Sequence, residues 1–282
     1  MKNFNGKHVL ITGAASGIGR ETAMAFAHEG AILCLADIDA EGVRQTKRLI
    51  CGLGGSARAF HCDVSDADSV KTMADAIHQD IDCLDILMNN AGLGCAGHFL
   101  ETSLETWQTI MNVNVMGVLN GCHAFLPKMI ERGNGGHVVN TSSSSAFVAT
   151  QELPLYAASK SAVLGFSESL RADMAKHAIG VTAICPGIVN TPIVANAIVE
   201  GGLAAMGRRD KIEAFYRRRN YQPSRVAREV LKAVKRNVGV KPISPEAWGM
   251  YYCKRLAPCV VDRLLTSQGP FYQRISDQSI SD

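Results

Sequence analysis

The sequence predicts an α/β domain built on a doubly wound parallel sheet, with helices on both faces. Short apolar runs rich in β-branched residues alternate with longer helical patterns, which is typical of βαβ units. With 282 residues, of which 47% are hydrophobic, the chain can bury the core of one such domain. A glycine-rich turn follows the first apolar run, at the position where sheets of this kind bind ligands.

Strands and helices are expected to alternate in the first third of the chain. The predicted strands are His8–Thr12, Ala31–Asp37, Ala57–Cys62 and Leu84–Asn89, and the predicted helices are Gly19–His28, Glu41–Gly52 and Asp66–Gln79. Gly30 stops the first helix, and Ser65 is the expected N-cap of the third. A helix therefore connects each strand to the next, as a parallel sheet requires.

The alternation continues to Pro186 and then becomes less regular. The later helices are expected at Leu104–Met111, Val113–Glu131 and Tyr156–His177, and the later strands at Gly136–Ser142 and Val181–Cys185. We expect one dinucleotide-binding and catalytic domain over 1–244, which includes a substrate segment at about 187–222. A helical extension over 245–282 follows and is not expected to be an independent domain.

Three glycines mark the turn after the first strand. Gly13, Gly17 and Gly19 have the spacing G-x-x-x-G-x-G, which lets the backbone turn sharply and approach a ligand closely. The next helix presents its unpaired N–H groups to an anion. This arrangement predicts a pyrophosphate site. The alternative interpretation is a tight turn that serves only close helix–strand packing.

Asp37, at the end of the second strand, indicates which dinucleotide binds. Its carboxylate can accept both hydroxyls of an adenosine ribose and would repel a 2′-phosphate. Ser16 stands in the glycine loop where a basic residue would help to bind that phosphate. Both residues favour NAD over NADP. An ordinary carboxylate at a strand end is the alternative interpretation of Asp37.

Tyr156 and Lys160 lie at i and i+4 of the long helix, so they share one face. An ammonium near a phenol lowers the phenol's pKa and suits it to proton exchange with an alcohol or carbonyl oxygen. Ser143, thirteen residues upstream of Tyr156, ends a strand and can bind the same oxygen. Asn114 lies early in a preceding helix. Within the serine run, Ser142 is the alternative to Ser143.

Together these motifs resemble the short-chain dehydrogenase/reductase family of the single-domain type, over about residues 5–195. The matching motifs are Thr12-Gly13-x-x-x-Gly17-x-Gly19, Asp63-Val64, Asn89-Asn90-Ala91-Gly92, Val113-Asn114, Ser143, Tyr156-x-x-x-Lys160 and Pro186-Gly187 with Thr191. The resemblance implies a Rossmann-like fold, a nicotinamide cofactor and hydride transfer at a CH–OH group. It also implies a homodimer or homotetramer.

The resemblance assigns roles to four catalytic residues. Tyr156 is the expected general acid/base, and Lys160 is expected to bind the nicotinamide ribose and lower the Tyr156 pKa. Ser143 is expected to hold the substrate oxygen, and Asn114 to keep a water in a proton relay. The expected cofactor-binding residues are Gly13, Ser16, Gly17, Ile18, Gly19, Asp37, Asp63, Val64, Asn90, Ala91, Gly92, Tyr156, Lys160, Pro186, Gly187, Ile188 and Thr191. No metal is expected.

An apolar stretch over 193–206 points to a hydrophobic substrate. With Phe99, Phe147, Val148, Leu153 and Leu155 it is expected to form an apolar pocket, in which Ser145, Phe147 and Leu153 contact the substrate. We therefore expect a secondary alcohol or its ketone of the steroid, terpenoid, aromatic or long-chain type.

Alternative functions depend on a basic segment. Residues 208–241 hold 12 Lys/Arg and 3 Asp/Glu, a local net charge of +9, whereas the whole chain carries only +3. A solvated helix face explains the segment; an acidic or acyl-thioester substrate and a membrane surface are the other interpretations. The small overall charge gives no indication of nucleic-acid binding. A catalytically idle member that acts through a partner is the remaining alternative.

The chain shows no signal peptide, no apolar run long enough to span a membrane and no C-x-x-C among its nine cysteines. These features predict a cytoplasmic protein with reduced thiols.

Overall fold

Seven parallel strands form the central sheet of the computed structural model, which describes residues 1, 3–205 and 208–266. The strand order is β3-β2-β1-β4-β6-β7-β9. The bounds are β1 His8–Thr12, β2 Ile32–Asp37, β3 Ser56–His61, β4 Ile86–Asn89, β6 Gly136–Thr141, β7 Ile179–Pro186 and β9 Val240–Ile243. The order reverses between β1 and β4, so the predicted doubly wound sheet is confirmed, and its switch point lies beside the glycine loop.

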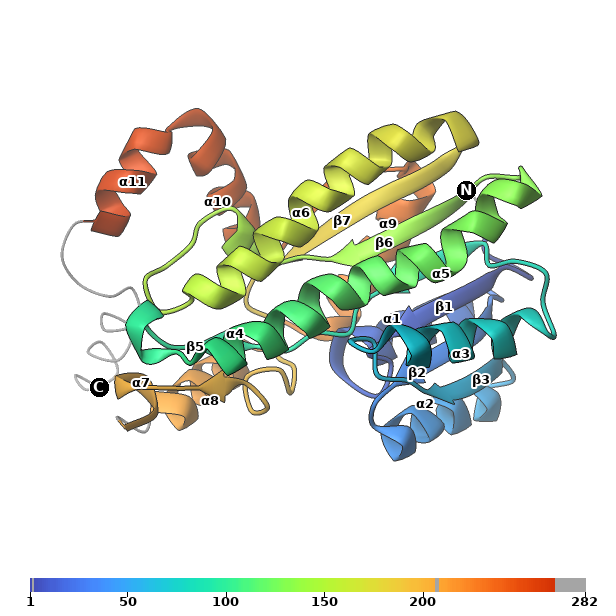
Figure 1. Ribbon diagram of the computed structural model, residues 1–282, viewed down its shortest axis with the longest axis horizontal. Coiled ribbons are helices and arrows are strands. Elements are labelled where there is room, and N and C mark those ends of the chain that lie inside the picture. Colours follow the sequence, from blue (N-terminus) through green and yellow to red (C-terminus); the bar gives the residue numbers. More distant parts are fainter. Residues whose placement is uncertain (2, 206–207, 267–282) are drawn as a thin grey trace.

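Helices cover both faces of this sheet (Figure 1). Helices α1 and α9 pack together on one face, and α3, α5 and α6 cover the other. The bounds are α1 Gly17–His28, α2 Ala40–Gly52, α3 Ala67–His78, α4 Leu104–Met111, α5 Gly117–Arg132, α6 Pro154–Met174 and α9 Pro223–Arg236.

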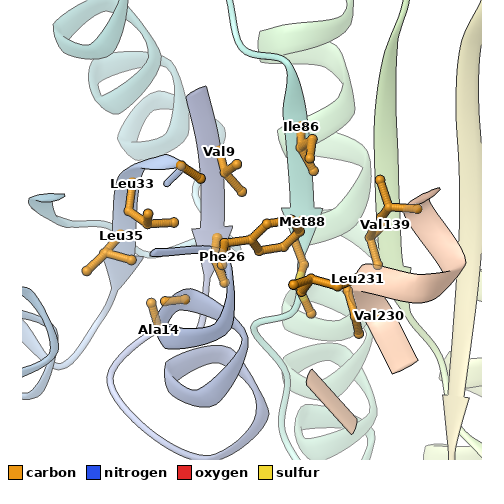
Figure 2. Close-up of a cluster of buried hydrophobic side chains, with 14 of the residues drawn as sticks. Val9, Ala14, Phe26, Leu33, Leu35, Ile86, Met88, Val139, Val230 and Leu231 are labelled. Carbon is orange, nitrogen blue, oxygen red and sulfur yellow. The ribbon is translucent and has the colours of Figure 1, made fainter. Parts of the chain in front are cut away.

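The core is divided into two layers because successive strand side chains point to opposite faces. In β1, Val9 and Ile11 belong to the layer under α1 and α9, and Leu10 belongs to the layer under α3 and α5. Figure 2 shows the first layer, in which Phe26 of α1 and Val230 of α9 meet the sheet. All of these side chains are completely buried. This packing holds the carboxyl ends of the strands in fixed positions.

Several helix boundaries differ from the prediction. Helix α1 begins at Gly17, two residues earlier than expected. The N-cap of α3 is Asp66, whose carboxylate accepts from the Asp68 N–H, so the expectation for Ser65 is wrong. The Ser65 hydroxyl instead donates to Asp63 at 2.7 Å. The first residues of the helix expected over Val113–Glu131 belong to a π-helical turn at Asn112–Met116, and α5 begins at Gly117.

The chain after β7 contains elements that the sequence pattern did not predict. Strand β5 (Cys95–Ala96) pairs with β8 (Ile198–Val199) outside the main sheet, and helices α7 (Gly202–Ala205) and α8 (Arg208–Arg219) follow. The main sheet then gains β9, which pairs with β7 from Ala183 to Pro186. Figure 1 shows α7 and α8 at the end of the molecule toward which β1 and β6 point.

The expected C-terminal helices are present as α10 (Pro245–Leu256) and α11 (Pro258–Thr266). The rest of the predicted extension, 267–282, lies outside the described residues. Within the described part of the chain, no helix is both long and apolar enough to cross a membrane. All nine cysteines are free thiols.

Candidate active site

The glycine loop is packed against its neighbours so closely that side chains do not fit. Gly13 and Gly17 have φ angles of +66° and +54°, which favour glycine. A Cβ on Gly19 would lie 2.0 Å from the Gly13 carbonyl oxygen, and one on Gly13 would lie 2.8 Å from the Ala91 Cα. The backbone at the start of α1 therefore remains open to a ligand. Ser16, the N-cap residue, is exposed and makes no side-chain capping bond.

Thr12 and Asn90 fix the loop to the ends of β1 and β4. The Thr12 hydroxyl oxygen accepts from the backbone N–H groups of Asn90 and Ala91, at 3.0 and 3.1 Å. The Asn90 amide donates to the carbonyls of Thr12 and Gly13, and its oxygen accepts from Thr141. The Asn90 side chain therefore holds the loop, rather than being free for a ligand.

Asp37 lies beside the glycine loop, as the sequence predicted. One carboxylate oxygen accepts from the Ala15 N–H at 2.8 Å, and the other accepts from the Asp39 N–H at 2.9 Å. Two charge-assisted bonds orient the carboxylate and leave its remaining lone pairs for ribose hydroxyls. Arg20, which the sequence analysis did not single out, donates to the Ala15 carbonyl and to Thr46 on the other side of the loop.

Asp63 and Val64 follow β3 at the same edge of the sheet. One Asp63 oxygen accepts from both the N–H and the hydroxyl of Ser65. The Val64 carbonyl accepts from Asn120 at 2.9 Å, and the Val64 side chain packs against Gly117. These contacts place α5 beside the strand end on which adenine is expected.

Asn114 lies in the π-helical turn and is completely buried. Its oxygen accepts from the Leu93 N–H at 2.8 Å, and its amide donates to the Leu93 carbonyl and to the Ser159 hydroxyl. A Cβ on Gly92 would lie 3.0 Å from the Asn114 oxygen and 3.2 Å from the Lys160 ammonium. Asn114 thus lies near Lys160, but its side chain serves the scaffold.

Ser143, Tyr156 and Lys160 are brought together as the sequence predicted. Ser143 lies two residues beyond the end of β6, and its hydroxyl lowers the pKa of Tyr156, which lies in the first turn of α6. The Lys160 ammonium lies 5.8 Å from the centre of the Tyr156 ring and donates to the Thr141 carbonyl at 3.1 Å. A serine hydroxyl, a phenol and an ammonium therefore share one site.

The pKa of Tyr156 moves in the direction opposite to the one expected. Burial raises the pKa of Tyr156 to about 12, although the bond from Ser143 acts against this, and Tyr216 of α8 raises it further. Burial also lowers the pKa of Lys160 to about 8. Desolvation disfavours both charged forms, and it is the largest cause of both shifts.

The serine run divides into different roles. The Ser142 hydroxyl donates to the Lys160 carbonyl at 2.7 Å and so belongs to the scaffold of α6. Ser143, by contrast, contacts Tyr156. Ser145 is buried, and its hydroxyl has no hydrogen-bond partner among the described residues. The structure therefore leaves the expected contact between Ser145 and a substrate as a prediction.

The residues expected to line an apolar pocket do not all lie in one place. Phe147 is buried and contacts Tyr251 of α10 edge-to-face at 5.1 Å, and Leu153 is half-buried at the start of α6. Phe99 is 62% exposed and packs edge-to-face on Trp107, so its place in a pocket stays a prediction. Leu155 instead belongs to a small buried cluster with Cys95 and Ile110.

The segment after β7 approaches the same region. Thr191 lies beside the glycine loop, because a Cβ on Gly17 would be 3.3 Å from its side chain. Gly187 and Ile188 follow Pro186 and meet Glu246 of α10, whose carboxylate accepts from the Ile188 N–H at 2.9 Å. The sequence analysis missed Glu246, which belongs to no recognised motif.

The basic segment forms an amphipathic helix over its second half. Val226, Val230 and Val234 of α9 are fully buried. On the outer face, Lys232 pairs with Glu229 and Lys235 pairs with Glu29. The interpretation of a solvated helix face fits α9. Arg217 and Arg218 of α8 are exposed.

Comparison with known proteins gives a consistent result. Residues 7–200 match the family described as short chain dehydrogenase. A protein of Mycobacterium tuberculosis named probable oxidoreductase EphD is 42% identical over 263 residues; the match covers 90% of this chain and 44% of that protein. The chain therefore spans less than half the length of that relative.

Two further proteins match along nearly their full length. The 1-deoxy-11-beta-hydroxypentalenate dehydrogenase of Streptomyces exfoliatus is 33% identical over 251 residues, which cover 84% of this chain and 91% of the enzyme. A crystal structure of a short chain dehydrogenase/reductase from Burkholderia phymatum in complex with NAD superposes with a TM-score of 0.87 at 27% identity. It covers 96% of this chain and 99% of that one.

Proposed function

The chain belongs to the short-chain dehydrogenase family of oxidoreductases, and we propose that it interconverts a hydrophobic secondary alcohol and its ketone with NAD as cofactor. The observation that carries this proposal is the contact between Ser143 and Tyr156, with Lys160 one helical turn away. A hydroxyl pair of this kind can hold one substrate oxygen and exchange its proton.

The glycine loop fits a dinucleotide. Its backbone is left bare by Gly13, Gly17 and Gly19, and the N-terminus of α1 favours the pyrophosphate. Asp37 would accept the adenosine ribose hydroxyls, and Asp63 and Val64 would hold adenine. Ile18, Ala91, Gly92, Pro186, Gly187, Ile188 and Thr191 would complete the site. When bound, the nicotinamide supplies or accepts the hydride.

The preference for NAD rests on Asp37. Its carboxylate is oriented by two backbone N–H groups, and a 2′-phosphate at that ribose would meet its negative charge. Ser16 offers no compensating cation. The crystal structure from Burkholderia phymatum, which is a complex with NAD, gives further support.

Tyr156 acts as the general acid/base in this proposal. The phenol donates a proton to the ketone oxygen in reduction and removes it from the alcohol in oxidation, while Ser143 holds that oxygen. Lys160 would bind the nicotinamide ribose from a position 5.8 Å from the centre of the Tyr156 ring. Asn114 supports this arrangement through the π-helical turn that faces Gly92 and Lys160.

The substrate is proposed to be hydrophobic because Phe147 and Leu153 flank the catalytic helix and the unpartnered Ser145 is the polar group beside them. Steroids, terpenoids and aromatic or long-chain ketones fit this description. A relative named as a dehydrogenase of a hydroxylated carboxylate supports a ring or chain that also bears an acid. Reduction of an acidic or acyl-thioester ketone is therefore the second candidate, and the exposed Arg217 and Arg218 of α8 favour it.

A spectrophotometric screen with NAD and NADP against secondary alcohols, from polyols to steroids and acids, tests the proposal. We expect turnover with NAD and apolar alcohols. Tyr156→Phe should then lower kcat by about 100-fold to 10,000-fold while NADH still binds. Ser142→Ala, which removes a scaffold hydroxyl, is the matched control and should keep its turnover. Tight NADH binding with no turnover on any substrate would favour the idle alternative.

We propose that the protein is cytoplasmic and that it forms a homodimer or homotetramer, as is usual for its family. Size-exclusion chromatography with light scattering measures the assembly. A monomer at micromolar concentration would contradict it.

A further inference from the structure

The C-terminal extension reaches back to the segment beside the catalytic site through one carboxylate. Glu246, in the first turn of α10, accepts from the Ile188 N–H at 2.9 Å. A Cβ on Gly187 would lie 2.3 Å from the same carboxylate oxygen, so only glycine allows this approach. Glu246 therefore holds the backbone at which the carboxamide end of the cofactor is expected.

The same carboxylate also holds α8. Arg219, the last residue of α8, donates to both Glu246 oxygens, one of them at 2.9 Å. Its guanidinium lies 3.5 Å from the Ile188 carbonyl. Each partner side chain is only 23% exposed, so solvent screens this ion pair less than a surface pair. Helix α8 also carries Tyr216, which raises the pKa of Tyr156.

The backbone before Glu246 is strained in a way that serves this contact. Ser244 has φ +94° and ψ 153°, a region that residues other than glycine rarely adopt. Its hydroxyl is buried, lacks a partner among the described residues, and would lie 2.5 Å from a Cβ on Gly187. Strain of this kind persists where the surroundings enforce one geometry, and here that geometry directs α10 onto Gly187 and Ile188.

We propose that Glu246 is a positioning residue that fixes the Ile188 backbone for the nicotinamide end of the cofactor and latches the end of α8 to the segment after β7 through Arg219. The inference rests on the proposed function, because it assumes that nicotinamide binds beside Ile188. Its two parts are separable: the bond to Ile188 needs only an acceptor oxygen, whereas the ion pair with Arg219 needs a negative charge.

The test compares the dissociation constants of NADH and ADP-ribose, since ADP-ribose lacks nicotinamide. In Glu246→Ala we expect NADH to bind about tenfold more weakly and ADP-ribose to bind within about twofold of wild type. Glu246→Gln keeps an acceptor for Ile188 and should restore most of the NADH affinity. Glu29→Gln, which breaks a distant ion pair with Lys235, is the matched control and should change neither constant.

Hydrogen–deuterium exchange of the intact protein reports on the latch without any cofactor. The peptide over 213–222 should exchange faster in Glu246→Ala, in Glu246→Gln and in Arg219→Met, because each variant lacks the ion pair. The role at Ile188 would be overturned if Glu246→Ala bound ADP-ribose normally and the ratio of the NADH dissociation constant to the ADP-ribose dissociation constant were unchanged or lower than in wild type. Unchanged exchange in all three variants would overturn the latch. If the wild-type protein bound NADH no more tightly than ADP-ribose, both the proposed function and this inference would be overturned.

Discussion

Replacement of Asn114 by alanine should destabilise the protein as strongly as a large core truncation. The side chain is completely buried and makes three hydrogen bonds, two with the Leu93 backbone and one with Ser159. Removing it leaves partly buried backbone groups unpaired, each at a cost of about 1–3 kcal/mol. We expect the free energy of unfolding to fall by about 3–5 kcal/mol, which corresponds to a decrease in Tm of about 10 °C.

Urea-induced unfolding followed by circular dichroism measures this loss. Asn120→Ala is the control, because Asn120 lies on the adjoining helix and makes one bond, to the Val64 carbonyl. That variant should lose about 1 kcal/mol. A loss below about 1 kcal/mol in Asn114→Ala would refute the reasoning, since the amide would then not be holding Leu93. Low activity of Asn114→Ala with full stability would instead indicate a direct part in proton transfer.

Two further predictions concern Asp37 and His137. Asp37→Asn should reduce the ratio of the NADP dissociation constant to the NAD dissociation constant by about fivefold to tenfold, because it removes a negative charge from the ribose site. An unchanged ratio would show that Asp37 does not contact the ribose. Burial lowers the pKa of His137 to about 3, and its ring bonds to Thr182. The unfolded chain takes up this proton near pH 6.5 and the folded chain does not, so stability should fall by about 2 kcal/mol from pH 7 to pH 5. Urea unfolding of His137→Gln should lack that part of the pH dependence, and the same slope in both proteins would contradict it.

The site was predictable where the chemistry is encoded by spacing along the chain. Tyr156 and Lys160 are four residues apart, which places them one turn apart on one face of an α-helix. Gly13, Gly17 and Gly19 come directly after a predicted strand, which places them in the turn that leads to the next helix. Asp37 ends an apolar run, which places it at the carboxyl edge of the sheet. For these residues the local sequence determines which part of a strand, turn or helix they occupy, and the structure places them at the carboxyl edge of the sheet.

Features that depend on distant segments were not predictable. Strand β9 contains Lys241 and Pro242, which are poor strand formers, and it pairs with β7 across a long insertion. Glu246 contacts Ile188 only because the chain returns to the sheet through β9. The predicted lowering of the Tyr156 pKa was wrong for a similar reason. Burial raises this pKa, and the extent of burial depends on packing that cannot be read from the spacing of residues along the chain.

The pairing of β7 with β9 has a consequence for how this protein could diversify. The 187–222 segment leaves the sheet after Pro186, and the chain re-enters it, after α9, in the neighbouring strand, with Pro186 opposite Ile243. Both ends of the excursion are thus anchored, so exchanging the segment between homologues costs little loop-closure entropy. The segment is therefore replaceable as a module, provided that an incoming segment keeps an arginine opposite Glu246.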